Sequence, residues 1–234
     1  MLLLENFENE SVEYVVTPPD DLTELAINDY HGRVDVLSLP SSVNYSNVQG
    51  GSVFAVQDTD AASAAADVIT LEFSGIDILG KINIEFSLFV AEDDATDGNE
   101  DWDSNSSFLV EYSVDGADYA RLFAIESEIG GDGNQTNERP RVDTDLDGTG
   151  DGAEITDVFT RYTAVIPDFG QTLDLRLSFR NLDSADEDFA IDQVEVSATE
   201  GLPGCSLADL APPFGVLDFS DVLTFLTAYG AGCP

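Results

Sequence analysis

The acidic segment at residues 143–154 carries the clearest chemical pattern in the sequence. It reads DTDLDGTGDGAE and matches the calcium-loop pattern D-x-D-x-D-G followed by five residues and Glu. Ca²⁺ takes about six to eight oxygen ligands, and carboxylates at alternate positions of a short loop can converge on it. Gly148 permits the sharp turn that this convergence requires. The expected ligands are Asp143, Asp145, Asp147, Thr149 through its carbonyl, Asp151 and Glu154.

The flanks of this loop differ from those of an EF-hand. Residues 135–141 contain Pro140 and lack helical periodicity, whereas residues 155–166 alternate like a strand. We therefore expect a calcium loop set between strands. Ca²⁺ is expected in preference to Mg²⁺, which demands a tighter octahedron. A structural role is expected for the ion, because extracellular calcium sites bind weakly, at about 10⁻⁴–10⁻³ M, and stay filled. The alternative is an acidic surface loop that binds no ion.

A second acidic cluster, at residues 92–103, has ligand chemistry without a recognised spacing. It would hold another calcium ion or complete the first site, and its candidate ligands are Asp93, Asp94, Asp97, Asp101 and Asp103. Trp102, the only Trp, lies inside this cluster. An exposed Trp102 would form a platform for stacking on a sugar, and the alternative is a Trp that fills the end of the core. A third acidic stretch, at residues 183–188, is expected to be a solvated loop.

Groups typical of catalysis are scarce in this chain. His31 is the only His, and neither Cys nor Ser stands in a recognisable nucleophile motif. We therefore expect no catalytic residue and no enzymatic activity. A glycosidase needs only two carboxylates, so a secreted hydrolase stays open as an alternative in a chain with 47 Asp and Glu residues.

The composition excludes several classes of partner. The 234 residues include 8 Lys and Arg against 47 Asp and Glu, a formal charge of −39. This charge repels nucleic acids and anionic membranes. Nucleic-acid binding is therefore not expected. Membrane insertion is not expected either, since no apolar run approaches the roughly 20 residues that span a bilayer. The hydrophobic fraction of 43% suffices for a packed core.

Alternating apolar residues predict an all-β domain over residues 1–199. Every second residue is apolar at residues 81–88 and 173–179, which is the period of a half-buried strand. The same pattern occurs at residues 68–73, 108–114, 158–166 and 189–196. The dipeptide Asp115-Gly116 predicts a type I′ hairpin turn. Short strands without a long amphipathic helix predict an antiparallel β-sandwich of the jelly-roll type.

Residues 200–234 are expected to form a linker and a small appendage. Apolar residues at helical spacing from Val222 to Tyr229 predict a short helix that ends at Gly230. The only two cysteines, Cys205 and Cys233, bracket this unit. We expect them to form a disulfide in an oxidising compartment, with two free thiols as the alternative.

The tail at residues 205–226, CSLADLAPPFGVLDFSDVLTFL, resembles the GC-type dockerin-like C-terminal anchoring segment of secreted bacterial proteins. The resemblance implies an exported protein whose tail mediates attachment. Residues 1–199 look like calcium-containing jelly-roll modules of the carbohydrate-binding or lectin-like kind. The first residues, 1–5, lack the basic region of a signal peptide.

These observations together predict a secreted, non-catalytic module that binds a glycan or a protein at the cell surface. The main alternative is a subunit that assembles with copies of itself into an extracellular fibre or surface layer, with calcium at the contacts. In that alternative the apolar residues Leu2, Leu4 and Phe7 would pair with a neighbour's sheet. Otherwise they pack on their own domain.

Overall fold

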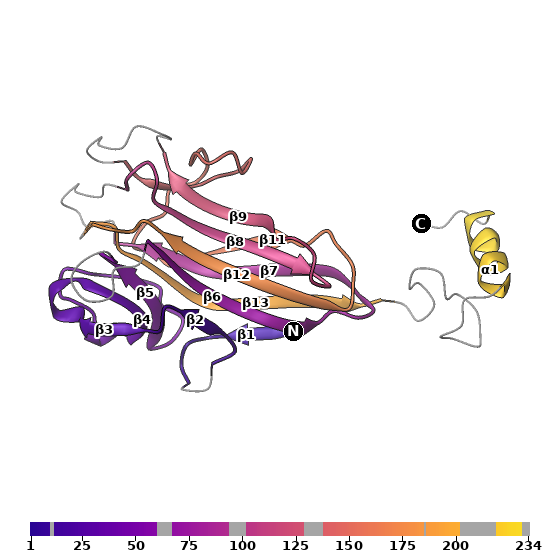
Figure 1. Ribbon diagram of the computed structural model, residues 1–234, viewed down its shortest axis with the longest axis horizontal. Helices are drawn as coiled ribbons and strands as arrows, with labels where there is room; N and C mark the ends of the chain where they lie inside the picture. Colours follow the sequence, from indigo (N-terminus) through magenta and orange to yellow (C-terminus); the bar gives the residue numbers. More distant parts are fainter. Residues whose placement is uncertain are drawn as a thin grey trace.

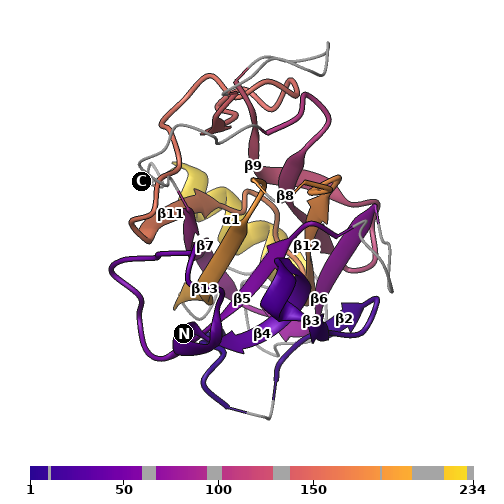
Figure 2. The same cartoon turned by 90° about the vertical axis from the view of Figure 1, so that its left-hand side faces the viewer.

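The computed structural model describes residues 1–9, 12–59, 67–93, 102–128, 138–184, 186–201 and 219–230. Two antiparallel sheets stack face to face (Figures 1 and 2). The seven-stranded sheet has the order β11 (Thr160–Val165), β7 (Lys81–Glu92), β13 (Phe189–Glu200), β5 (Ser52–Gln57), β4 (Asp29–Asp35) and β3 (Asp21–Glu24), with β1 (Leu3–Glu5) also paired to β13. The six-stranded sheet has the order β10 (Pro140–Val142), β9 (Ala120–Ser127), β8 (Ser107–Val114), β12 (Thr172–Arg180), β6 (Val68–Asp77) and β2 (Val15–Thr17).

The core between the sheets is built by the alternation that the sequence shows. Leu173, Leu175, Leu177 and Phe179 of β12 are all buried there, together with apolar residues of β6, β7 and β8. The intervening residues of β12 are polar and point away from this core. The predicted antiparallel β-sandwich is therefore confirmed.

A smaller apolar cluster covers the outer face of the seven-stranded sheet. Tyr30, Val53 and Phe159 are buried in it, and Tyr45 packs edge to face against Phe159 with ring centroids 5.4 Å apart. The covering side chains come from the 3₁₀ helix η2 (Val36–Ser38), from the residues after it, and from Leu25 of η1 (Leu25–Ile27), which lies between β3 and β4.

The N-terminal strand belongs to its own domain. Leu3 of β1 pairs with Val196 of β13, and Phe7 is fully buried against Tyr14 and Phe54. Of the two alternatives for this segment, the structure has the one in which it packs on its own domain, because β13 provides the partner edge and the core takes the Phe7 ring.

The connection from β8 to β9 is the predicted tight turn. Asp115 has φ of 54° and Gly116 has φ of 75°, which are the two positive angles that a type I′ turn requires. This turn fixes the register in which β8 and β9 pair.

Helix α1 (Phe219–Gly230) lies beyond the end of the sandwich at which β13 finishes (Figure 1). Its start and end lie close to the helix expected from residues 222–230. Cys205 and Cys233 lie outside the described residues. Within the described parts of the chain, we find no helix with the length and apolar character needed to span a membrane.

Candidate metal centre

The loop at residues 143–154 follows the edge strand β10 and lies against its neighbour β9. The Asp143 amide donates to the Ala124 carbonyl over 3.0 Å, and the Gly150 amide donates to the Ser127 carbonyl over 2.8 Å. A Cβ atom at Gly150 would lie 2.4 Å from the Glu126 carbonyl oxygen, so only glycine allows this close approach. The loop is therefore anchored to a rigid strand.

Three carboxylates converge within this loop. Asp143, Asp145 and Asp147 each place an oxygen so that the three atoms lie within 4.8 Å of one another. Asp143 is buried, whereas Asp145 and Asp147 are exposed. Repulsion by the neighbouring Asp147 carboxylate raises the pKa of Asp145. A bound cation would relieve this repulsion, so the arrangement suits a metal ion.

Backbone amides of the loop hold the Asp143 carboxylate in place. Asp143 accepts hydrogen bonds from the Asp147 and Gly148 amides, at 3.3 and 2.8 Å. Gly148 has φ of 97°, which supplies the sharp turn expected there, and Leu146 has φ of 60°. Arg121 Nη1 of β9 donates to the Leu146 carbonyl over 3.3 Å and ties the tip of the loop to the sheet.

Asp151, one of the six expected ligands, has other partners. Asp151 Oδ1 accepts hydrogen bonds from the Thr144 amide and hydroxyl, at 2.9 and 2.8 Å, and these bonds lower the pKa of Asp151. Asp151 therefore closes the neck of the loop. The Thr149 amide donates to Asp147 over 3.1 Å and orients that carboxylate.

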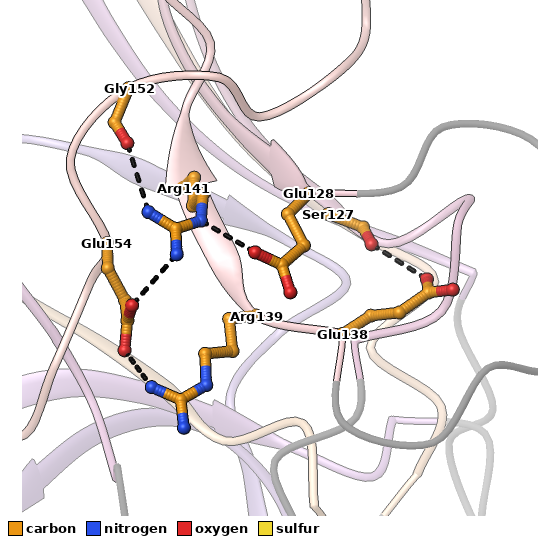
Figure 3. A network of polar contacts seen from close by, with 7 residues as sticks. All are labelled: Ser127, Glu128, Glu138, Arg139, Arg141, Gly152 and Glu154. Carbon is orange, nitrogen blue, oxygen red and sulfur yellow. Dashed lines mark hydrogen bonds and ion pairs between the residues drawn. The ribbon is translucent and has the colours of Figure 1, made fainter.

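Glu154, the expected bidentate ligand, lies in an ion-pair network (Figure 3). One of its oxygens pairs with Arg139, and the other accepts from Arg141 Nη2 over 3.0 Å. Arg141 also pairs with Glu128 over 2.7 Å and donates to the Gly152 carbonyl over 3.3 Å. The structure thus assigns Glu154 to a staple between β10 and the end of the loop, and not to the aspartate group.

The second acidic cluster is only partly described. Asp94, Asp97 and Asp101 lie outside the described residues. The Asp93 amide donates to Asp188 over 2.9 Å, and the Asp103 amide donates to Glu187 over 2.9 Å. Across the described ranges, the only group of three or more potential ligands within 4.8 Å is the one in the 143–154 loop.

Trp102 is part of the core. Its side chain is 0% exposed and packs edge to face on Phe189, with ring centroids 5.5 Å apart. The expectation that it stacks on a sugar is wrong because no face of the indole reaches solvent. The alternative, a Trp that fills the end of the core, is confirmed.

Glu187 and Asp188, in the stretch expected to be a solvated loop, are buried, so that expectation is wrong for them. Glu187 is fully buried and accepts four hydrogen bonds, from the Asp103, Asp183 and Ser184 amides and the Ser106 hydroxyl. Burial raises the pKa of Glu187 to about 7, against the opposing effect of the hydrogen bonds. Its carboxylate organises two loops, a role that no sequence motif indicates.

His31 also has a structural position. It is 2% exposed, and its Nε2 lies 3.0 Å from the Pro19 carbonyl oxygen. This contact joins β4 to the segment before β3.

Comparisons with known proteins identify no family. No family model matches the chain, and no curated protein matches it. A cleaved adhesin domain of Lys-gingipain from Porphyromonas gingivalis is similar in structure, with a TM-score of 0.46 and 14% identity over 84% of this chain and 98% of that one. Tailspike protein 4 of bacteriophage CBA120 has a TM-score of 0.41 and 8% identity over 83% and 20%, and CBM35 from Paenibacillus barcinonensis has a TM-score of 0.36 and 12% identity over 84% and 99%. At these scores the likenesses carry no functional argument for this chain.

Proposed function

We propose that this protein is a secreted, non-catalytic β-sandwich module that binds a glycan or a protein and is stabilised by calcium. The observation that carries the proposal is the convergence of Asp143, Asp145 and Asp147 in a loop anchored to β9. The small number of groups suited to catalysis, with the single His buried against a backbone carbonyl, favours binding over catalysis.

In this proposal the three aspartates hold one Ca²⁺ ion, with loop carbonyls and water completing its shell. Ca²⁺ accepts such an irregular set of oxygens more readily than Mg²⁺, which needs an octahedron at shorter distances. Asp151 and Glu154 keep their partners Thr144, Arg139 and Arg141 and shape the loop from outside. The ion then cross-links the loop and adds stability only to the folded state.

We further propose that the C-terminal segment attaches the module to a partner at the cell surface. Helix α1 exposes apolar side chains, including Phe219 and Tyr229, and carries one acidic residue and no basic residue. An exposed apolar helix is suited to a hydrophobic groove on a second molecule. The disulfide Cys205–Cys233 belongs to this proposal and would brace the segment.

Calorimetric melting in 10 mM Ca²⁺ and in EDTA tests the metal site. A dissociation constant of about 10⁻⁴–10⁻³ M predicts about 1.4–2.7 kcal/mol of stabilisation at that concentration. The double variant Asp145→Ala/Asp147→Ala should melt in calcium at its own EDTA temperature. Asp67→Ala, which removes an exposed carboxylate just before β6, is the control and should keep the full shift. Equal wild-type melting curves with and without calcium would refute the metal site.

A further inference from the structure

A cavity of about 330 Å³ lies at the end of the sandwich where β8 turns into β9. The loop that precedes β12 forms its other wall. Its lining residues are Tyr112, Val114, Asp115, Ala117, Asp118, Ala120, Asp168 and Phe169. None of them belongs to the 143–154 loop, and the volume lies at the low end of the roughly 300–1,000 Å³ of ligand pockets.

The cavity combines carboxylates with an exposed aromatic ring. Phe169 is 61% exposed, although an apolar ring of this size is usually buried. Three of the lining residues are aspartates, and those that the structure describes include neither Lys nor Arg. A ligand held here therefore meets negative charge beside an aromatic face.

Two of the three carboxylates are fixed before any ligand arrives. Asp168 accepts a hydrogen bond from the Tyr112 hydroxyl over 2.7 Å. Asp115 accepts from the Gln171 and Thr172 amides, at 2.8 and 2.9 Å. These bonds join the β8–β9 turn to the loop before β12, so the wall of the cavity is preorganised.

The carboxylates of this cavity do not converge on a point. In the part of the chain that the structure describes, only the group of Asp143, Asp145 and Asp147 brings three such oxygens within 4.8 Å. The spread of Asp115, Asp118 and Asp168 around a larger space suits an extended organic cation better than a metal ion.

A guanidinium is already held in this way nearby, by Glu111 of β8 and Tyr119 of the connection between β8 and β9. The Arg176 guanidinium carbon lies 4.1 Å from the centroid of the Tyr119 ring. Its Nε and Nη2 donate to Glu111 over 3.0 and 2.9 Å. An arginine between an aromatic face and a carboxylate is thus a stable arrangement on this sheet. The cavity offers the same pair of groups in Phe169 and the neighbouring aspartates.

We propose that this cavity receives an arginine side chain of a partner protein, with the guanidinium over the Phe169 ring and bonded to Asp118 and Asp168. This inference rests on the proposed binding function and chooses a protein over a glycan as the ligand. The charge of −39 attracts a cationic side chain, whereas a neutral sugar gains nothing from it. Arginine fits better than lysine because its planar fork both stacks and bonds to carboxylates.

The test is an NMR titration of the ¹⁵N-labelled full chain with the capped peptide acetyl-Gly-Arg-Gly-amide. A control titration uses the analogue in which citrulline replaces arginine, which has the same shape without the charge. A third titration uses the neutral disaccharides cellobiose, xylobiose and lactose. We expect saturable shifts of the amides at residues 112–120 and 166–171 with the arginine peptide only. Phe169→Ala and Asp118→Asn should each weaken binding about threefold to tenfold.

Two control variants separate the cavity from general charge effects. Leu37→Ala removes an apolar side chain that is 95% exposed on η2, and Asp67→Asn removes one exposed carboxylate near the other end of β6. Both should bind the arginine peptide like the wild type. Equal binding by the citrulline peptide, or equal weakening in Asp67→Asn, would overturn the proposal.

The remaining outcomes distinguish this inference from the proposed function. Saturable shifts at the cavity with a disaccharide would reject arginine and keep a binding module. Arginine-peptide shifts confined to other residues would reject the cavity. The titration is run both in EDTA and in calcium. Its result therefore does not depend on whether the melting test finds that calcium stabilises the protein.

Discussion

Several buried carboxyl groups are tuned by their surroundings, and Glu126 of β9 shows the effect of burial most simply. Burial raises the pKa of Glu126 to about 7, with Arg121 opposing and Asp143 adding to the shift. A carboxyl whose pKa is higher in the folded than in the unfolded state binds protons more tightly when folded. Its contribution to stability is complete below about pH 4.5 and is lost as the pH rises through about 7.

Glu126→Gln should remove this loss. In EDTA, its free energy of unfolding relative to the wild type should increase by about 2 kcal/mol between pH 5 and pH 8, measured by urea unfolding at each pH. Glu72→Gln, which changes an exposed carboxyl on the same sheet, should show no such increase. A pH-independent difference for Glu126→Gln would contradict the effect of burial.

At the scale of elements, Glu154 separates the sequence pattern from the structure. The calcium-loop pattern makes it a ligand, whereas the structure pairs it with Arg139 and Arg141 (Figure 3). Glu154→Gln should therefore lower stability by about 1 kcal/mol, because the part-exposed network loses its charged carboxylate while Arg141 keeps its ion pair with Glu128. The increase in melting temperature on adding Ca²⁺ should stay as in the wild type, measured by calorimetry. Loss of that increase, as expected for the double variant Asp145→Ala/Asp147→Ala, would show that Glu154 binds the ion.

The same loop shows how far sequence reasoning reaches. The convergence of Asp143, Asp145 and Asp147 could be predicted from their spacing in the sequence, because a turn at Gly148 brings alternate residues together. The partners of Glu154 depend on the antiparallel bridge that sets it opposite Arg141, which the calcium-loop spacing does not encode. Strands such as β12 and the Asp115-Gly116 turn were predictable because their signals are also local. The burial of Trp102 and Glu187, and the cavity beside Phe169, depend on contacts between distant segments.

For the whole molecule, the net charge of −39 is the main electrostatic influence on stability. Folding brings these charges together, so their mutual repulsion opposes the compact state. Six of the eight basic side chains form ion pairs with acidic ones in the described parts of the chain; Lys81 with Glu200 and Arg161 with Glu195 are two examples. Stability should therefore depend on mobile cations from the solution.

Monovalent salt should stabilise the protein even without calcium. The screening length falls from about 30 Å at 0.01 M to about 3 Å at 1 M, which removes most repulsion between exposed carboxylates. In EDTA, the melting temperature should rise by about 5 °C or more over this range. NaCl and KCl should act equally, because screening depends on charge and not on ion identity. A melting temperature that is constant or falls with salt would show that the carboxylates are already neutralised within the fold.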